Sequence, residues 1–211
     1  MRVPCQPPPL PAQRSVRPAW RPLISGLRVH ISSLRNEAEL LDRLRQGCRV
    51  VLYSGFSPNH LPQPGQEYAR PYAATAEQQA PMFKYLPMEE QLEKYRQKNC
   101  PDSPSRLTSV YTTTSPEDAA RFGEVFELEV ALRPQALSSG RLPVRWLDRN
   151  TFDYLIENQR WLLRAGRGQF QKMLDDYWTG SGSHRGISDI LLDPLQVEIR
   201  VMGFVRHAAR G

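Results

Sequence analysis

The sequence predicts an α+β fold, in which strands and helices are mixed along the chain. Of its 211 residues, 40% are apolar and 24% are charged, which is typical of a globular domain with a buried core. Segments with strand periodicity and segments with helix periodicity both occur along the chain. They do not alternate strictly, as they would in a parallel βαβ sheet.

Charge is concentrated at the N-terminus. Residues 1–36 contain six arginines, seven prolines and no acidic residue, whereas the rest of the chain has 22 basic and 22 acidic residues. Proline removes backbone donors, so residues 1–34 are predicted to be a flexible basic leader and residues 35–211 a single domain. The leader is a candidate export arm, or a ligand for an acidic or proline-reading partner. The rest of the chain has no net charge, which argues against a broad nucleic-acid-binding surface on the domain.

Several classes of protein are excluded by what the sequence lacks. No apolar run approaches the roughly 18 residues of a membrane-spanning helix, so no membrane span is predicted. The three cysteines and four histidines are scattered, which predicts neither a disulfide scaffold nor a metal site. The standard nucleotide-binding motifs and the nucleophile elbow are absent. Dispersed thiols fit a cytoplasmic protein, or one secreted into a host or target cell.

The first predicted elements follow from caps and periodicity. Asn36 and Glu39 have capping-box spacing, a leucine stripe follows, and Gly47 supplies a left-handed stop, which predicts a helix between them. A β-branched strand over 48–53 is predicted to end at Ser54-Gly55. Residues 56–74 contain four prolines and are predicted to form a long loop.

The middle of the chain has clear helix-start signals. Thr75 is a candidate cap for a helical stretch, and Pro87 precedes a predicted helix over 88–98. A strand is predicted over 107–111. Ser115 and the proline after it then open a short helix, as N-cap and first helical residue, and Gly123 ends that helix.

The last third contains the remaining predicted elements. A strand over 125–132 and a turn at 138–140 precede one long helix over 151–177, interrupted near Gly166 and Gly168. Trp161 is predicted to pack in the core with this helix. A glycine-rich loop over 179–186 then leads to strands at 190–192 and 195–205.

Three segments support a functional hypothesis. They are Leu52-Tyr53-Ser54-Gly55; Val110-Tyr111-Thr112-Thr113-Thr114-Ser115 with the following Pro116–Gly123; and Ser188-Asp189-Ile190-Leu191-Leu192-Asp193-Pro194. In this order they resemble the strand motifs of the mono-ADP-ribosyltransferase superfamily, over about residues 50–205. The second segment is the most specific. The resemblance implies the ADP-ribosyltransferase-like fold of that superfamily, in which helices flank a split, twisted sheet of mixed and antiparallel strands, and NAD as co-substrate.

The resemblance also implies a binding role for residues of the first two segments. The backbone N–H and C=O of Gly55 would hold the carboxamide of nicotinamide, because glycine lets a flat ring approach the main chain. The hydroxyl triplet would bind the ribose, and Thr113 would help to position the catalytic acid. The residues expected to line the co-substrate are therefore Tyr53, Ser54, Gly55, Tyr111, Thr112 and Thr114, with Tyr111 able to stack on a ring.

Two carboxylates compete for the catalytic role. Asp189 matches the acid of the third motif, which would stabilise the oxocarbenium-like transition state formed as nicotinamide leaves. Glu198 lies in a Gln-x-Glu spacing that carries the catalytic glutamate in many toxins of this superfamily, or else it belongs to the polar face of a strand. The sequence departs from the motifs at Ser54, where Arg or His is usual, and at Asp189, where Glu is usual.

The sequence therefore predicts an NAD-dependent ADP-ribosyltransferase that modifies a protein or nucleic acid, as a bacterial toxin or effector does. This reaction needs no metal. A catalytically inactive interaction module on the same fold is the main alternative, favoured by Ser54. An RNA-processing phosphotransferase of the same fold would need a basic groove, which the neutral body argues against. An unrelated α+β binding domain remains the fourth possibility.

Overall fold

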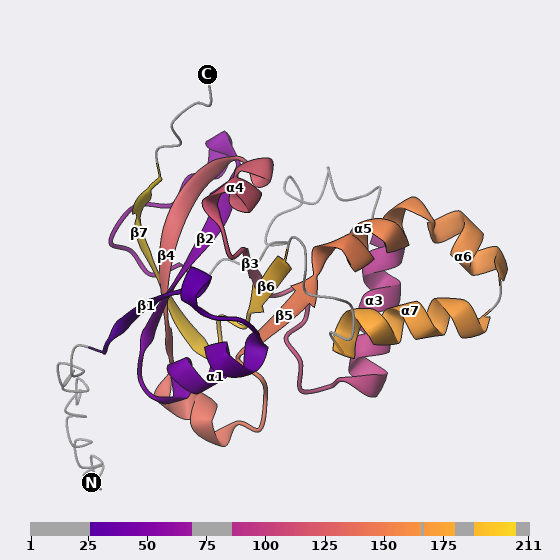
Figure 1. The fold of residues 1–211 in the computed structure, drawn as a ribbon, viewed down its shortest axis with the longest axis horizontal. Coiled ribbons are helices and arrows are strands. Elements are labelled where there is room, and N and C mark those ends of the chain that lie inside the picture. The colour runs from indigo at the N-terminus through magenta and orange to yellow at the C-terminus, as the bar shows by residue number, and fades with distance from the viewer. Residues whose placement is uncertain (1–25, 69–85, 166, 180–187, 206–211) are drawn as a thin grey trace, which may run out of the picture.

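The computed structural model describes residues 26–68, 86–165, 167–179 and 188–205, which form two sheets with flanking helices (Figure 1). The large sheet has the strand order β1-β2-β4-β7, and the small sheet has the order β3-β6-β5. β1 and β2 are parallel, and the other pairs are antiparallel. The predicted α+β class, with a split mixed sheet, is confirmed at this level. The strands are β1 (Arg28–His30), β2 (Arg49–Phe56), β3 (Val110–Thr112), β4 (Glu124–Leu132), β5 (Val144–Asp148), β6 (Ser188–Leu192) and β7 (Val197–Phe204).

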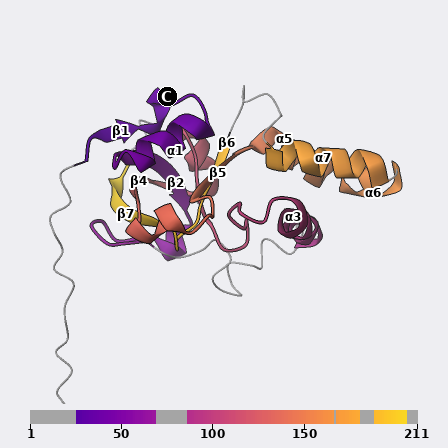
Figure 2. The same cartoon turned by 90° about the horizontal axis from the view of Figure 1, so that it is seen from below.

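The helices divide between the two ends of the molecule. α1 lies with the large sheet, whereas α3, α5, α6 and α7 gather beyond the small sheet (Figures 1 and 2). The α-helices are α1 (Glu37–Arg45), α3 (Leu86–Asn99), α4 (Pro116–Ala119), α5 (Arg149–Glu157), α6 (Gln159–Ala165) and α7 (Arg167–Thr179). Short 3-10 turns are η1 (Ile31–Ser33), η2 (Pro58–His60), η4 (Ala120–Phe122) and η5 (Pro134–Ser138). No helix in the described ranges is long and apolar enough to cross a membrane.

The predicted start and stop of α1 are confirmed. The Asn36 side chain accepts the Glu39 N–H (3.0 Å), and the Glu39 carboxylate accepts the Arg35 N–H (2.8 Å), so one donor of the first turn and the donor just before the cap are satisfied. Gly47 has a φ of +79° just after the helix. Before this helix, β1 pairs with β2 and Ile31 is fully buried, so the folded body begins before residue 35. Residues 1–25 of the predicted leader lie outside the described residues.

The small sheet separates two apolar cores. Alternate residues of a strand face opposite sides, so Ile190 and Leu192 of β6 pack with α1 and the large sheet, whereas Leu191 packs with α3, α5 and α7. Asp189 shares the face of Leu191. The second core contains the fully buried Trp178, whose indole N–H donates to the Leu92 oxygen of α3 (3.2 Å). A buried carboxylate therefore lies at the edge of the helical core.

Four expectations about the elements need correction. β2 runs through Ser54 and Gly55, because its pairing with β4 continues to the end of the strand. β5 is a strand that the periodicity did not predict. The predicted long helix is three helices, already interrupted at Asn158. Trp161 is 49% exposed, although its neighbour Leu162 is fully buried. The helical stretch predicted after Thr75 lies outside the described residues.

Candidate active site

The three segments singled out in the sequence lie side by side where the two sheets meet. Tyr53 of β2 and Thr113, the residue after β3, form an isolated antiparallel bridge. The Tyr53 N–H donates to the Thr113 oxygen (3.3 Å), and the Thr113 N–H donates to the Tyr53 oxygen (2.7 Å). The Ser54 hydroxyl donates to the backbone oxygen of Tyr111 (2.8 Å). The first two segments are therefore joined by direct hydrogen bonds.

β6 brings the third segment to the same place. Thr112 lies opposite Ile190, and the Thr112 hydroxyl donates to the Ile190 oxygen (3.0 Å). Thr113 follows Thr112 and Asp189 precedes Ile190, so this pairing brings the second and third segments together. Asp189 itself lies opposite Leu147 of β5.

The threonine hydroxyls serve the fold in this conformation. Thr112 and Thr113 are only 1% and 3% exposed. The Thr113 hydroxyl donates to the Ser115 oxygen (2.8 Å), next to the N-terminus of α4. Ser115 caps that helix as predicted, with its side chain accepting the Asp118 N–H (3.1 Å). Thr114 is half-buried, so it is the member of the triplet that solvent reaches most easily.

Gly55 is a residue of β2, and α4 and η4 cover one of its faces. A Cβ at position 55 would lie 2.1 Å from the Ala119 oxygen and 2.9 Å from the Phe122 Cβ, so packing alone requires glycine there. Backbone groups alternate in direction along a strand, so the Gly55 N–H and C=O point away from β4, as those of Tyr53 do. Among the described residues, Thr113 is the last strand partner on that edge of β2.

Glu198 lies away from this junction. It sits on β7 opposite Ala131 and pairs with the exposed Arg200 (3.3 Å). Gly55 lies opposite Val125, six residues earlier on β4, which is about 20 Å along the strand. One nicotinamide ring cannot touch both Gly55 and Glu198, so Asp189 is the carboxylate that belongs to the junction.

Asp189 is a buried carboxylate between two arginines. It is 2% exposed, and its Oδ2 lies 3.3 Å from Arg149 Nη1 and 3.9 Å from Arg106 Nη1. Burial raises the pKa of the Asp189 carboxyl above its ordinary value, because desolvation disfavours the charged form more than the two guanidinium groups favour it. The carboxylate is thus part of an ion-pair network.

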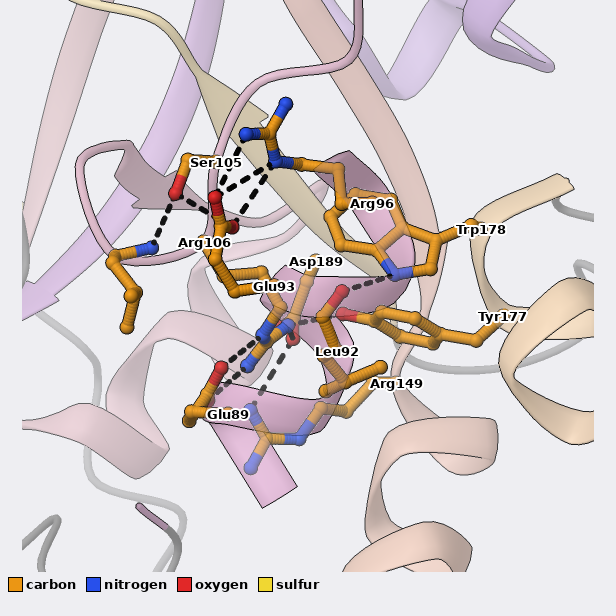
Figure 3. Close-up of polar contacts among 11 residues, drawn as sticks. Glu89, Leu92, Glu93, Arg96, Ser105, Arg106, Arg149, Tyr177, Trp178 and Asp189 are labelled. Carbon is orange, nitrogen blue, oxygen red and sulfur yellow. Dashed lines mark hydrogen bonds and ion pairs between the residues drawn. The ribbon is translucent and has the colours of Figure 1, made fainter. Parts of the chain in front are cut away.

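Arg106 is the centre of that network, which we call the Arg106 cluster: Glu89, Arg106, Arg149, Tyr177 and Asp189 (Figure 3). Arg106 donates to Glu89 of α3 through Nε and Nη2, both at 2.8 Å, and through Nη1 to the Tyr177 hydroxyl. Its guanidinium also lies 4.0 Å from the centroid of the Phe152 ring. Arg106 and Glu89 are each 2% exposed, so this planar bidentate pair is fully removed from water.

A second ion pair fastens the chain that carries Arg106. The Glu93 carboxylate of α3 accepts Arg96 Nη2 (2.7 Å) and the Ser105 hydroxyl (2.9 Å). Arg96 in turn donates to the backbone oxygen of Ser103 (2.9 Å). Figure 3 shows these contacts of Glu93 and Arg96 beside the Arg106 cluster. Glu93 and Arg96 of α3 therefore both bind the turn before β3, at Ser105 and Ser103 respectively.

Glu93→Gln is expected to lower the free energy of unfolding at pH 7 by about 1–2 kcal/mol, as charge-assisted hydrogen bonds become neutral ones. Burial alone would raise the pKa of Glu93. The hydrogen bonds from Arg96, Ser105 and Gln97 lower the pKa by more than burial raises it, so the pKa of Glu93 lies below its ordinary value. The carboxylate therefore stabilises the fold above the unfolded pKa of about 4.3, and this contribution is lost as the pH falls through the lowered pKa. Urea unfolding at pH 7, 5 and 3 measures it.

The exposed Glu90 on the same helix supplies the control. Glu90→Gln should change the unfolding free energy by less than about 0.5 kcal/mol at each pH. A Glu93→Gln defect that is as large at pH 3 as at pH 7 would contradict the role given to the charged form of Glu93.

A hollow in the described part of the chain lies away from the junction. This open hollow of about 440 Å³ between α5 and α7 is lined by Asp148, Lys172 and Asp176 among others, and by none of the predicted site residues. No group of three or more His, Cys, Asp or Glu side chains in the described part of the chain could hold a metal ion. Comparison with models of known protein families and with curated proteins found no match to this chain.

Proposed function

We propose that the chain is an NAD-dependent ADP-ribosyltransferase that modifies a macromolecule. The observation that supports this most is the convergence of three distant segments, since Tyr53 pairs with Thr113 and Thr112 pairs with Ile190, the residue after Asp189. The backbone edge at Gly55, which pairs with no strand of the described residues, adjoins them. This reaction needs two things from the protein: a backbone edge that binds the carboxamide, and a carboxylate that stabilises the positive transition state.

The residues act on the N-glycosidic bond of NAD. As the bond between ribose C1′ and the nicotinamide nitrogen breaks, its electron pair goes to the ring and neutral nicotinamide leaves. The Asp189 carboxylate stabilises the positive charge that builds on the ribose. The acceptor forms the new bond to C1′ and loses its proton. A protein side chain or a nucleic-acid base can be this acceptor, and a toxin or effector role follows if it belongs to a target cell.

A catalytically inactive interaction module is the second candidate, and two observations favour it. Asp189 is already neutralised by Arg149, and the Ser54 hydroxyl is bound to the Tyr111 oxygen, so neither group faces a ligand in this conformation. Such a module would bind NAD, or a partner, without breaking the glycosidic bond. Release of nicotinamide separates the two candidates, because water can serve as acceptor when the natural one is unknown.

Asp189→Asn is expected to lower the rate of nicotinamide release by about 100-fold or more, the usual loss when a transition-state charge is removed. The same change at the other carboxylate, Glu198→Gln, should leave the rate within twofold. The reaction needs the charged form of Asp189, so the wild-type rate should fall as the pH is lowered through the pKa of Asp189. An exposed aspartate has a pKa of about 3.9, and because the pKa of Asp189 is raised, the fall should be centred at a higher pH than that. Chromatography of NAD reactions measures the rates.

Three results would count against this assignment. Loss of activity in Glu198→Gln with normal activity in Asp189→Asn would exchange the two carboxylates. NAD binding by calorimetry without nicotinamide release, and without label transfer from NAD to cell-lysate proteins or RNA, would favour the inactive module. Neither binding nor turnover would reject both.

A further inference from the structure

Arg149 occupies a position that Arg106 does not share. It is the first residue of α5, and its guanidinium bridges a buried and an exposed carboxylate. Nη1 lies 3.3 Å from Asp189, and Nε lies 2.9 Å from Asp153, whose side chain is 43% exposed. The Arg149 side chain is itself 21% exposed, compared with 2% for Arg106. A solute can therefore reach Arg149 but not Arg106.

Arg149 also connects Asp189 to the backbone edge at Gly55. Its guanidinium lies 5.4 Å from the centroid of the Phe122 ring, which belongs to η4. Phe122 in turn packs against Gly55, since a Cβ at position 55 would lie 2.9 Å from the Phe122 Cβ. The Arg149 guanidinium therefore contacts both Asp189 and the turn that covers Gly55.

The two arginines differ in what each would leave behind if it moved. Arg106 makes two 2.8 Å hydrogen bonds to Glu89, and its departure would leave a fully buried carboxylate unpaired. Arg149 holds Asp189 by one longer contact, at 3.3 Å. The other carboxylate that Arg149 contacts, Asp153, is exposed to solvent. If Arg149 moved, Asp189 would keep Arg106 at 3.9 Å. Arg106 is therefore the fixed cation, and Arg149 is the one that can change partner.

We propose that Arg149 binds the pyrophosphate of the dinucleotide and releases Asp189 as it does so. This assignment rests on the proposed function and adds to it the residue that binds the pyrophosphate and the exchange of partners by which Asp189 is released. Phosphate oxygens accept planar, paired hydrogen bonds from a guanidinium as carboxylates do, so the ligand replaces Asp189 as the partner of Arg149. Without a pyrophosphate, Arg149 stays paired with Asp189, and the guanidinium offsets the negative charge of the Asp189 carboxylate.

Calorimetry with three ligands tests the proposal on the full chain. NAD and ADP-ribose contain the pyrophosphate, whereas nicotinamide riboside has the same nicotinamide and ribose without phosphate. Arg149→Gln should weaken NAD and ADP-ribose binding by about 10- to 100-fold, and should not weaken nicotinamide riboside binding. Asp189→Asn should tighten ADP-ribose binding, because Arg149 loses its competing partner. Opposite effects of the two halves of one ion pair are not expected from a structural role.

Two further variants keep the result interpretable. Arg200→Gln removes an equally charged but distant residue of β7, and should change ADP-ribose binding by less than twofold. Arg149→Lys keeps a charge beside Asp189 if the glutamine variant does not fold, and should still weaken NAD binding, because ammonium cannot pair with phosphate in the planar mode. Thermal unfolding without ligand checks the fold of each.

The contrary outcomes are distinct. Normal NAD binding by a folded Arg149→Gln protein, or equal losses for NAD and nicotinamide riboside, would overturn the role of Arg149 and leave the proposed function standing. Weaker ADP-ribose binding by Asp189→Asn would do the same. A wild-type protein that binds neither NAD nor ADP-ribose would overturn the proposed function and this inference together.

Discussion

Glu89→Gln is expected to lower the free energy of unfolding by about 3–5 kcal/mol, the largest loss foreseen for a polar substitution in this chain. The glutamine is nearly the same size, but it leaves the buried guanidinium of Arg106 with only the more distant Asp189 carboxylate, at 3.9 Å, as a charged partner. Arg106 is 2% exposed, so water cannot replace the lost carboxylate. Urea unfolding followed by circular dichroism at pH 7 measures the loss.

A double variant distinguishes a charge effect from a packing effect. Glu89→Gln with Arg106→Met removes both charges and should recover a substantial part of the loss, because a buried pair replaced as a whole costs much less than a pair broken in half. Glu90→Gln on the same helix should remain within about 0.5 kcal/mol of wild type. Should the double variant be no more stable than Glu89→Gln, the ion pair would not be the source of the effect.

Gly55→Ala is expected to destabilise the protein by about 3 kcal/mol, at the upper end of what overpacking costs. The new Cβ would meet the Ala119 oxygen at 2.1 Å, and a backbone atom cannot move aside as a flexible side chain can. Either β2 or the α4–η4 turn must shift, and the pairing of Tyr53 with Thr113 lies within the same region. Thermal and urea unfolding both measure the cost.

Gly203 is the matched control, since it also lies in a strand of the large sheet and a Cβ there meets nothing within 4 Å. Gly203→Ala should be neutral or slightly stabilising, because alanine loses less backbone entropy than glycine on folding. Similar stability of the two alanine variants would show that the turn does not press on Gly55 as the distances indicate.

Local signals in the sequence were enough to predict much of the fold. Asn36, Ser115 and Gly123 act through their own side chains or backbone freedom, so their roles as caps and stops are written in a few neighbouring residues. β5 was missed for the opposite reason. Arg145 and Asp148 interrupt its apolar pattern, and partners distant in sequence hold it: the Glu37 carboxylate accepts from Arg145 (2.9 Å).

The candidate site was predictable only in part. Motif order directed attention to Tyr53, Thr113 and Asp189, which the topology brings together. Nothing in the sequence indicated the importance of Arg106, because it follows a turn and its partner Glu89 reads as one more charge on an amphipathic helix. Buried ion pairs depend on which helix faces are covered, and that is decided by tertiary packing rather than by spacing along the chain.

The contact between Gly55 and the turn after β3 has a consequence for how related chains would be recognised. Gly55 packs against Ala119 and Phe122 of that turn, and Gly123, at the end of the turn, has a positive φ and a Cβ position 2.2 Å from the Phe56 oxygen. Selection for folding alone would keep both glycines, even in a descendant that had lost its chemistry. Across an ancestry of this fold, those two positions would therefore record shared architecture, whereas, under the proposed function, the residues at 149 and 189 would record whether turnover was retained.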